Sequence, residues 1–281
     1  MTGVPPVQDG RSDARVDSGR VRPELRSWWR PEGKNQRRGV FTSEHASMGS
    51  ATATLAIEAS DIARRYGTSW VLRGVSLHVD AGEVVGLMGA NGSGKSTLLR
   101  ILATLLRPHR GAARVWGHDV VRDAPDVRAL IGYLAHSPGL YDDLTARENL
   151  AFVASMLARD ARDVDRVLER VDLEGVADNQ VRALSAGMQR RVALARLIMI
   201  RPRMLLLDEP YSNLDTAGIE LMNSLVSEWA DQGTSALLVL HELAPAAGLL
   251  DRTVTIREGR IALASPLLDA SETDIPATAA R

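Results

Sequence analysis

One lysine stands apart from the arginines that supply nearly all the positive charge of this chain. Of the 34 basic residues only Lys34 and Lys95 are lysine, and Lys95 lies in a glycine-rich segment. The segment reads Gly89-Ala90-Asn91-Gly92-Ser93-Gly94-Lys95-Ser96-Thr97. A compact ammonium can sit among phosphate oxygens, whereas a planar guanidinium needs more room. The spacing G-x-x-x-x-G-K-S is that of the phosphate-binding P-loop, which predicts a nucleoside triphosphate with Mg²⁺ as the ligand.

The P-loop residues have distinct predicted roles. Main-chain N–H groups of the loop and of the helix after it point at the phosphates. Three glycines let the main chain follow the tight path, Lys95 reaches the β- and γ-phosphates, and the Ser96 hydroxyl ligates Mg²⁺. The alternative is an ordinary glycine turn before a helix. The order of strand, turn and helix favours the P-loop.

A buried strand that ends in two acids supplies the second half of a nucleotide site. The run Met204–Leu207 is entirely apolar, and Asp208 and Glu209 follow it directly. A carboxylate at such a strand end can lie against Mg²⁺, so we expect Asp208 to ligate the ion. Glu209 is the candidate general base, because it can reach the water that attacks the γ-phosphate. The alternative is a pair of solvated acids.

Strands and one helix must hold these residues in place. Glu83–Met88 is an apolar run that ends at the P-loop, and Thr54–Glu58 and Val71–Val79 are two further strand-like runs. A helix is predicted to begin at about Lys95 and to end by Pro108. Its expected buried face consists of Leu98, Leu99, Ile101 and Leu102.

Fully apolar short strands recur later in the chain, at Met204–Leu207 and Ser235–Leu240. Such strands are typical of a parallel sheet that is covered on both faces. A helical stretch, residues 145–182, precedes them and opens with Thr145 and Glu148 at the spacing of a capping box. Amphipathic helices are predicted there by the apolar residues Leu150, Phe152, Val153 and Met156, and by the segment Val164–Val171.

Composition limits the remaining possibilities. The 281 residues are 45% hydrophobic, which is ample for a core, and the net charge is −1. Residues 1–50 carry nine basic and six acidic side chains, a net +3, so the remainder carries −4. These first residues lack periodicity, which predicts a disordered tail. The absence of cysteine excludes disulfides and thiolate chemistry. No apolar run is long enough to cross a bilayer, and no secretory signal is expected.

Four further motifs resemble those of the ABC ATPases. His241, after the strand at residues 235–240, looks like the switch histidine of that family, and Tyr66 resembles its adenine-stacking aromatic residue. The other two are a signature-like segment, usually written LSGGQ, and a segment similar to the D-loop. They read Leu184-Ser185-Ala186-Gly187-Met188-Gln189 and Ser212-Asn213-Leu214-Asp215. The resemblance covers about residues 55–266, with the motifs in the family's order.

Each of these motifs has a plainer reading when it is taken alone. Tyr66 could be a surface aromatic, and His241 could be a histidine whose hydrogen bonds are satisfied at a strand end. Ser185 and Gly187 could mark an ordinary helix N-terminus, where serine and glycine are favoured.

The resemblance implies an α/β fold of the P-loop ABC type. This fold has a mixed sheet core, an antiparallel β subdomain and a helical subdomain, here at about residues 134–190. The ATPase domain is then expected at residues 51–268, between the tail at 1–50 and a flexible C-terminal tail at 269–281. ATP and Mg²⁺ are the implied cofactors. The implied partners are membrane permease subunits and a second ATPase copy, with no nucleic acid, at the cytoplasmic face of the inner or plasma membrane.

The resemblance also implies the roles of individual residues. Two domains pair head to tail around two ATP molecules, with Lys95, Glu209 and His241 catalytic in cis. Ser185 and Gly187 close on the γ-phosphate from the other subunit. Asp215, in the D-loop, is a further nucleotide-binding residue, and Tyr66 stacks on adenine.

One departure from the family pattern concerns catalysis. His136 stands where the family usually carries a glutamine that senses Mg²⁺ and the attacking water. Imidazole can make the water contact, and imidazole side chains titrate near neutral pH. We therefore include His136 among the catalytic residues, the alternative being a loop residue without this role. Ala186 replaces a signature glycine and adds only a methyl group.

The segments around His136, the signature and Glu209 are similar to those of the haem-exporter ATPase of bacterial cytochrome c maturation. The resemblance implies haem export as the transport reaction. The alternatives are an ATPase for export of a drug, lipid or peptide, and a soluble ABC ATPase. A soluble translation factor of this family usually carries two ATPase domains, and this chain has one P-loop. A repair ATPase needs a long coiled coil, and no long heptad run separates Lys95 from Asp208.

Overall fold

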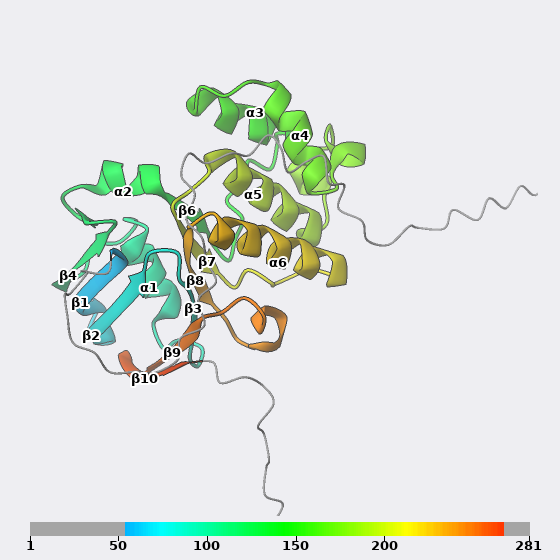
Figure 1. The fold of residues 1–281 in the computed structure, drawn as a ribbon. Helices are drawn as coiled ribbons and strands as arrows, with labels where there is room; N and C mark the ends of the chain where they lie inside the picture. Colours follow the sequence, from blue (N-terminus) through cyan, green and yellow to red (C-terminus); the bar gives the residue numbers. More distant parts are fainter. Residues whose placement is uncertain (1–53, 267–281) are drawn as a thin grey trace, which may run out of the picture. The chain divides into compact units, whose positions relative to one another are not determined.

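The computed structural model describes residues 54–266, and the tails expected at 1–50 and 269–281 lie outside this range. A six-stranded sheet carries the catalytic segments (Figure 1), in the order β10-β9-β3-β8-β7-β6. All its neighbouring strands run parallel except β10, which is antiparallel to β9. The strands are β3 (Val84–Met88), β6 (Ile131–Leu134), β7 (Met204–Asp208), β8 (Ser235–Val239), β9 (Arg252–Arg257) and β10 (Arg260–Pro266).

A second sheet is antiparallel, with the strand order β2-β1-β4-β5. Its strands are β1 (Leu55–Tyr66), β2 (Ser69–Asp80), β4 (Arg110–Val115) and β5 (His118–Asp119). The pairing of β1 with β2 shifts register between Ala59 and Ile62, where Asp61 has a φ of 52°. The mixed core sheet and the antiparallel sheet confirm the expected fold class.

The helix after the P-loop lies between the two sheets. It is α1 (Lys95–Leu102), and it begins at the residue expected from the sequence and ends before Pro108. The four predicted core residues of α1 are fully buried, and they share one hydrophobic core with side chains of both sheets. This position ties the phosphate-binding segment to both layers of the core.

The other face of the core sheet is covered by α5 (Ala186–Ile200) and α6 (Thr216–Asp231), as Figure 1 shows. The helix α5 also packs against α3 (Ala146–Met156) and α4 (Arg162–Arg170). The helix α2 (Ala124–Leu130) precedes β6, and short 3₁₀ turns cover Glu174–Val176, Val181–Ala183 and Ala244–Ala246. No helix within residues 54–266 is long and apolar enough to cross a membrane.

The capping box at the start of α3 is confirmed. The Thr145 hydroxyl accepts a hydrogen bond from the Glu148 amide at 3.0 Å, and the Thr145 amide donates to the Glu148 carboxylate at 2.8 Å. These two bonds satisfy two of the amide groups that every helix start leaves without a partner in the helix.

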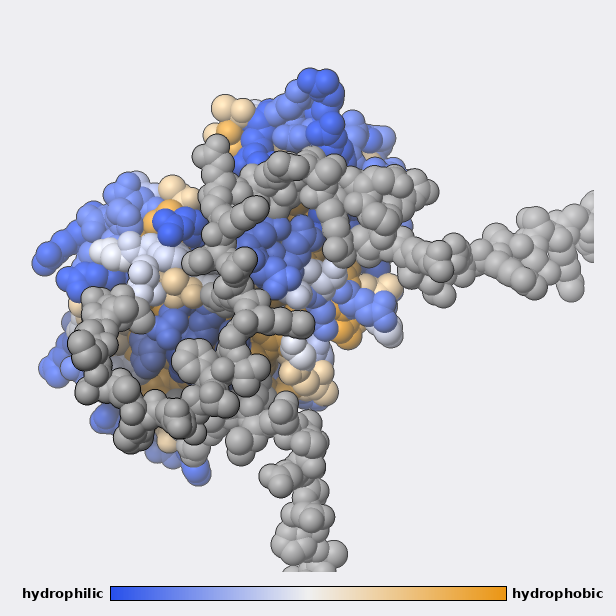
Figure 2. Space-filling view, in the orientation of Figure 1, coloured by the Kyte–Doolittle hydropathy of each residue, from blue (hydrophilic) through white to orange (hydrophobic). Residues whose placement is uncertain are grey.

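The buried face of α3 differs from the expected one. Phe152 and Met156 are 45% and 72% exposed, whereas Ala146, Leu150 and Ala154 are buried. Ala146, Leu150 and Ala154 recur every four positions, so they share the buried face of α3, while Phe152 and Met156 point to solvent. Figure 2 shows apolar surface beside α3. We call the exposed side chains of Tyr141, Phe152, Met156 and Leu157 the apolar patch.

Candidate active site

The P-loop turns sharply between β3 and α1. Gly89, Gly92 and Gly94 have φ angles of 143°, 77° and 109°. Residues other than glycine rarely adopt such positive φ angles. A Cβ atom at Gly89 would overlap the carbonyl oxygen of Ile256, and one at Gly94 would lie 2.5 Å from Leu72 Cδ2. The chain therefore passes so close to β9 and β2 that glycine is needed at both positions.

Lys95 is held by the loop that precedes it. Its side chain is 6% exposed, and Nζ donates to the carbonyl oxygens of Gly89 at 2.7 Å and Ala90 at 3.1 Å. Burial lowers the pKa of Lys95, and the negative charges of Glu209 and Asp208 oppose this effect. The ammonium is thus fixed at the mouth of the loop, opposite two carboxylates.

Replacing Lys95 with arginine is expected to weaken Mg·ATP binding by at least about tenfold, although the charge is kept. The guanidinium is too wide for the space between the two loop carbonyls. Calorimetric titration of nucleotide measures the effect, and Lys34→Arg makes the same change at the only other lysine. Equal affinity in Lys95→Arg and wild-type protein would show that any cation suffices.

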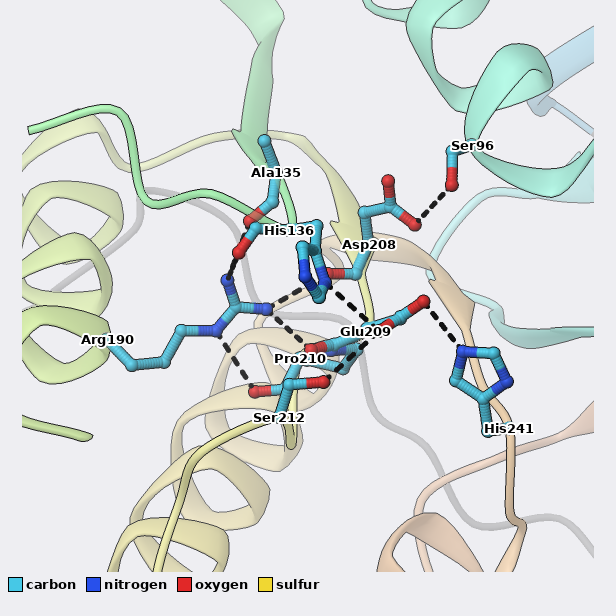
Figure 3. A network of polar contacts seen from close by, with 9 residues as sticks. All are labelled: Ser96, Ala135, His136, Arg190, Asp208, Glu209, Pro210, Ser212 and His241. Carbon is cyan, nitrogen blue, oxygen red and sulfur yellow. Dashed lines mark hydrogen bonds and ion pairs between the residues drawn. The ribbon is translucent and has the colours of Figure 1, made fainter. Parts of the chain in front are cut away.

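Ser96 and Asp208 meet across α1 and β7. The Ser96 hydroxyl donates to Asp208 Oδ1 at 3.0 Å (Figure 3), and Asp208 is almost fully buried. Burial raises the pKa of Asp208, the hydrogen bond from Ser96 opposes this, and the Glu209 charge adds to it. Hydroxyl and carboxylate oxygens are the ligands that Mg²⁺ prefers, so this donor pair fits the expected ion.

Two histidines lie within hydrogen-bonding distance of the carboxylate of Glu209 (Figure 3). His241 Nε2 lies 2.6 Å from Oε1, and His136 Nδ1 lies 3.1 Å from Oε2. The Ser212 hydroxyl donates to Oε2 at 3.3 Å. Burial alone would raise the pKa of Glu209, but the His241 hydrogen bond and the charges of both histidines leave it below its usual value. Glu209 is therefore an oriented, ionised carboxylate.

One cavity of about 550 Å³ joins these groups. Its lining comes from the P-loop and α1, from β2 and from the ends of three core strands. The residues are Val71, Asn91, Gly92, Gly94, Lys95, Ser96, Thr97, His136, Glu209 and His241. The lysine, the candidate base and both histidines thus face one space, which is large enough for a triphosphate. An adjoining cavity is lined by the start of the loop, Gly89 to Ser93, and by residues 255–258.

Four of the residues expected to bind nucleotide line neither of these two cavities. Tyr66 ends β1 with 45% of its surface exposed, and the Arg64 guanidinium lies 5.3 Å from its ring centre. Ser185 is the N-cap of α5, with Gly187 in the first turn. Asp215 is the N-cap of α6 and accepts from the Gly218 amide at 2.8 Å. Ser185 and Gly187 are expected to contact ATP that is bound by a second copy. Such a role requires that they lie outside the cavity of their own chain.

Arg190 is a residue of the site that sequence reasoning missed. It is 2% exposed and lies on α5, where its guanidinium donates to the carbonyl oxygens of Ala135 at 2.6 Å, Asp208 at 2.9 Å and Glu209 at 2.6 Å. Weaker bonds reach His136 and Pro210 (Figure 3). Burial lowers the pKa of Arg190 to about 10, while nearby Asp208 and Glu209 oppose this effect.

A signal for this burial was present in the sequence. Ala193 and Leu194, three and four positions after Arg190, are fully buried and lie on the same face of α5. A cation on such a face must find acceptors inside the protein. Arg190 therefore ties the segments that carry His136 and Glu209 to the helix that begins at the signature.

Comparisons with known proteins agree with this geometry. A family model described as ABC transporter matches residues 72–212. The chain is 40% identical over 213 residues to the daunorubicin resistance ATP-binding protein DrrA3 of Streptomyces coeruleorubidus, covering 74% of this chain and 67% of that protein. It is 38% identical over 198 residues to the cytochrome c biogenesis ATP-binding export protein CcmA 2 of Cupriavidus metallidurans, covering 70% and 94%.

Solved structures have the same fold. An ATP-binding subunit of an ABC transporter aligns with a TM-score of 0.70 at 29% identity, covering 75% of this chain and 90% of that one. The ATP-binding cassette MJ0796, in a dimeric post-hydrolysis state bound to ADP and Pi, aligns with a TM-score of 0.68 at 25% identity, covering 75% and 99%. The chain therefore belongs to the ABC transporter family, as one of its ATP-binding subunits.

Proposed function

We propose that this chain hydrolyses Mg·ATP and that the reaction drives a membrane permease. The observation that carries the proposal is the Glu209 carboxylate, held by two histidines in the same cavity as Lys95. A carboxylate that is only partly accessible and fixed at both oxygens is suited to orient a water molecule. The P-loop amides and the lysine opposite it are suited to bind the phosphates that this water attacks.

The proposed reaction is an in-line attack of water on the γ-phosphate. Glu209 accepts the water proton, while His241 and His136 keep its oxygens in place. Lys95 and the loop amides stabilise the charge on the phosphate oxygens. Ser96 and Asp208 would hold Mg²⁺, which when bound neutralises phosphate charge.

Residues outside the cavity complete the proposed site. In a head-to-tail dimer, Ser185 and Gly187 of one copy would bring the start of α5 to the γ-phosphate held by the other copy. The amides at that helix start attract an anion. Tyr66 is proposed to stack on adenine, and Asp215 to act at the dimer contact. The solved relative that is a dimer bound to ADP and Pi supports the pairing of two copies.

Replacing His136 with glutamine is expected to preserve or raise the rate of ATP hydrolysis at neutral pH. The fall of this rate on the acidic side of its pH profile should move to higher pH. The charge of His136 helps to keep the pKa of Glu209 low, and an amide lacks that charge. A base with a higher pKa loses its active, deprotonated form at a higher pH as the solution is acidified. The pH profile of kcat measures this, with His78→Gln, at an exposed histidine outside the cavity, as control. An unchanged profile would exclude an influence of His136 on the base.

The apolar patch is the proposed contact surface for the permease. Tyr141 and Phe152 stack edge to face at 5.5 Å, so two aromatic rings form one exposed unit. Exposed apolar clusters of this kind mark protein contacts. Tyr141 of the patch follows His136 by five positions, which would link the permease to the catalytic carboxylate. Co-purification of tagged chain with its permease tests this, and Tyr141→Ser with Phe152→Ser should abolish the association while purified protein still hydrolyses ATP.

We further propose haem export for cytochrome c maturation as the transport reaction, because relatives named for cytochrome c biogenesis align over nearly their whole length. The second candidate is drug export, which the equally similar daunorubicin resistance proteins favour. Deleting the gene in its bacterium separates the two. Loss of covalent haem attachment to c-type cytochromes, restored by wild type and not by Glu209→Gln, supports haem export. Intact cytochromes with increased drug sensitivity support the second candidate.

A further inference from the structure

A basic hollow lies on the outer face of the antiparallel sheet. It has a volume of about 460 Å³ and shares no residue with the cavity at the P-loop. Alternate residues of a strand face opposite sides, so Ile62 and Leu72 enter the core, whereas Arg73 is exposed and the buried Ala63 lines the floor of the hollow. We call this hollow the arginine groove. It is lined by Asp61, Ala63, Trp70, Arg73, Gly74, Arg110 and Arg260.

The strand register explains why the face is hollow. Ala63 on β1 pairs with Arg73 on β2 and with Arg110 on β4, so a methyl group lies between two long side chains. Trp70 forms a wall, with the Arg110 guanidinium 5.8 Å from its ring centre. The backbone irregularity at Asp61 disrupts the pairing next to Ala63.

The third arginine reaches the groove from the other sheet. Arg260 begins β10, and its Nη1 atom lies 4.0 Å from the position that a Cβ atom of Gly74 would take. The Asp61 Oδ1 atom lies 3.8 Å from the same position. The only acid of the groove therefore sits near one arginine, at the end where Gly74 leaves room.

The charge of the groove is not neutralised within the described part of the chain. Across residues 54–266, Arg73, Arg110 and Arg260 form no ion pair, whereas Arg114 on the same sheet pairs with Glu58 at 3.5 Å. Three arginines and one aspartate leave a net charge of +2. The whole chain carries −1, so this excess is local and does not reflect a generally basic protein.

We propose that the arginine groove binds a phosphomonoester with a neighbouring hydroxyl group. A phosphomonoester carries a charge of about −1.5 to −2 at neutral pH, which matches the groove. Guanidinium groups bind phosphate oxygens through paired hydrogen bonds. Asp61 can accept a hydrogen bond from the hydroxyl, which favours a polyol phosphate over inorganic phosphate. The ligand is either a soluble sugar or glycerol phosphate or the headgroup of a lysophosphatidic acid, which keeps one free hydroxyl beside its phosphate, and the site is independent of ATP hydrolysis.

Titration of glycerol 3-phosphate into the full-length protein tests this proposal, with the P-loop first saturated with Mg·ADP. We expect saturable heat with wild-type protein and none with glycerol. Arg73→Gln with Arg110→Gln should weaken binding at least about tenfold, because each lost bond joins two charged groups. Arg114→Gln with Arg128→Gln removes the same charge outside the groove and should leave the affinity unchanged. Both double variants should retain wild-type ATP hydrolysis.

Flotation with phosphatidylcholine vesicles that contain lysophosphatidic acid, against pure phosphatidylcholine vesicles, identifies the source of the ligand. Binding of glycerol 3-phosphate that depends on Arg73 and Arg110 supports a soluble ligand. Binding of the vesicles alone, with the same dependence, supports a lipid headgroup. The proposal is overturned if neither probe binds, or if the two double variants lose binding equally, since the attraction would then be general charge.

Discussion

The Glu209→Gln variant is expected to lose about 10²- to 10⁴-fold in kcat for ATP hydrolysis, which is the usual contribution of a positioned base. The amide keeps the shape of the side chain and can still contact His241 and His136. It cannot accept the proton of the attacking water. ATP affinity should change little, because Lys95 and the P-loop amides that bind the phosphates are untouched. The dimer should persist, since the ATP that holds it is no longer consumed.

Single-turnover kinetics and light scattering with Mg·ATP measure both effects. The matched control is Glu220→Gln on the exposed side of α6, which should hydrolyse ATP at the wild-type rate. If Glu209→Gln turned over ATP as fast as this control, another group would have to serve as base.

The Arg190→Gln variant is expected to lose about 3–5 kcal/mol of folding stability, the usual cost of breaking a buried charged network. The guanidinium serves five carbonyl oxygens, and glutamine has two N–H groups with a shorter reach. The carbonyls of Ala135 and Asp208 would lose this donor inside the protein, each at a cost of about 1–3 kcal/mol before relaxation, whereas the Glu209 carbonyl keeps the Ser212 amide. His136 and Glu209 would lose their common anchor, so kcat should fall more than ATP affinity.

Chemical denaturation and steady-state kinetics separate the two effects. Arg190→Lys keeps the charge and is expected to fold, with a smaller loss of stability and a clear loss of kcat, because an ammonium cannot span both loops. The exposed Arg182→Gln is the control. Wild-type kcat in a folded Arg190→Lys protein would mean that the charge alone positions the loops.

Local patterns in the sequence predicted much of the fold. The apolar runs at β7 and β8 are strands buried along their whole length, and α1 buries the four expected residues. These elements are set by nearest neighbours in sequence: an apolar run, a glycine turn, a capping pair. The structure also places Lys95, Ser96, Asp208, Glu209 and His241 together, at the carboxyl ends of β3, β7 and β8, where ligands bind in such sheets.

What sequence reasoning missed depends on distant contacts. Phe152 and Met156 have the spacing of a helix core, but the buried face of α3 is the one that carries Ala146, Leu150 and Ala154. Arg190 looks like a polar residue of a motif until the loops at residues 135 and 209 fold over it. The contacts of His136 and His241 with Glu209 likewise depend on three loops that are far apart in the sequence. Local sequence patterns do not encode how such loops meet.

The central position of β3 has a consequence for synthesis on the ribosome. This strand leads into the P-loop, and its two neighbours, β8 and β9, are the last parallel strands to be made. The Val84 amide donates to the Asp251 carboxylate, 167 positions away. At about 5–20 residues per second, the nascent segment would wait roughly ten to thirty seconds for that partner. A chain stalled before Arg252 would contain every P-loop residue and still lack β9, whose Ile256 carbonyl lies against Gly89, so the P-loop gains this neighbour only late in synthesis.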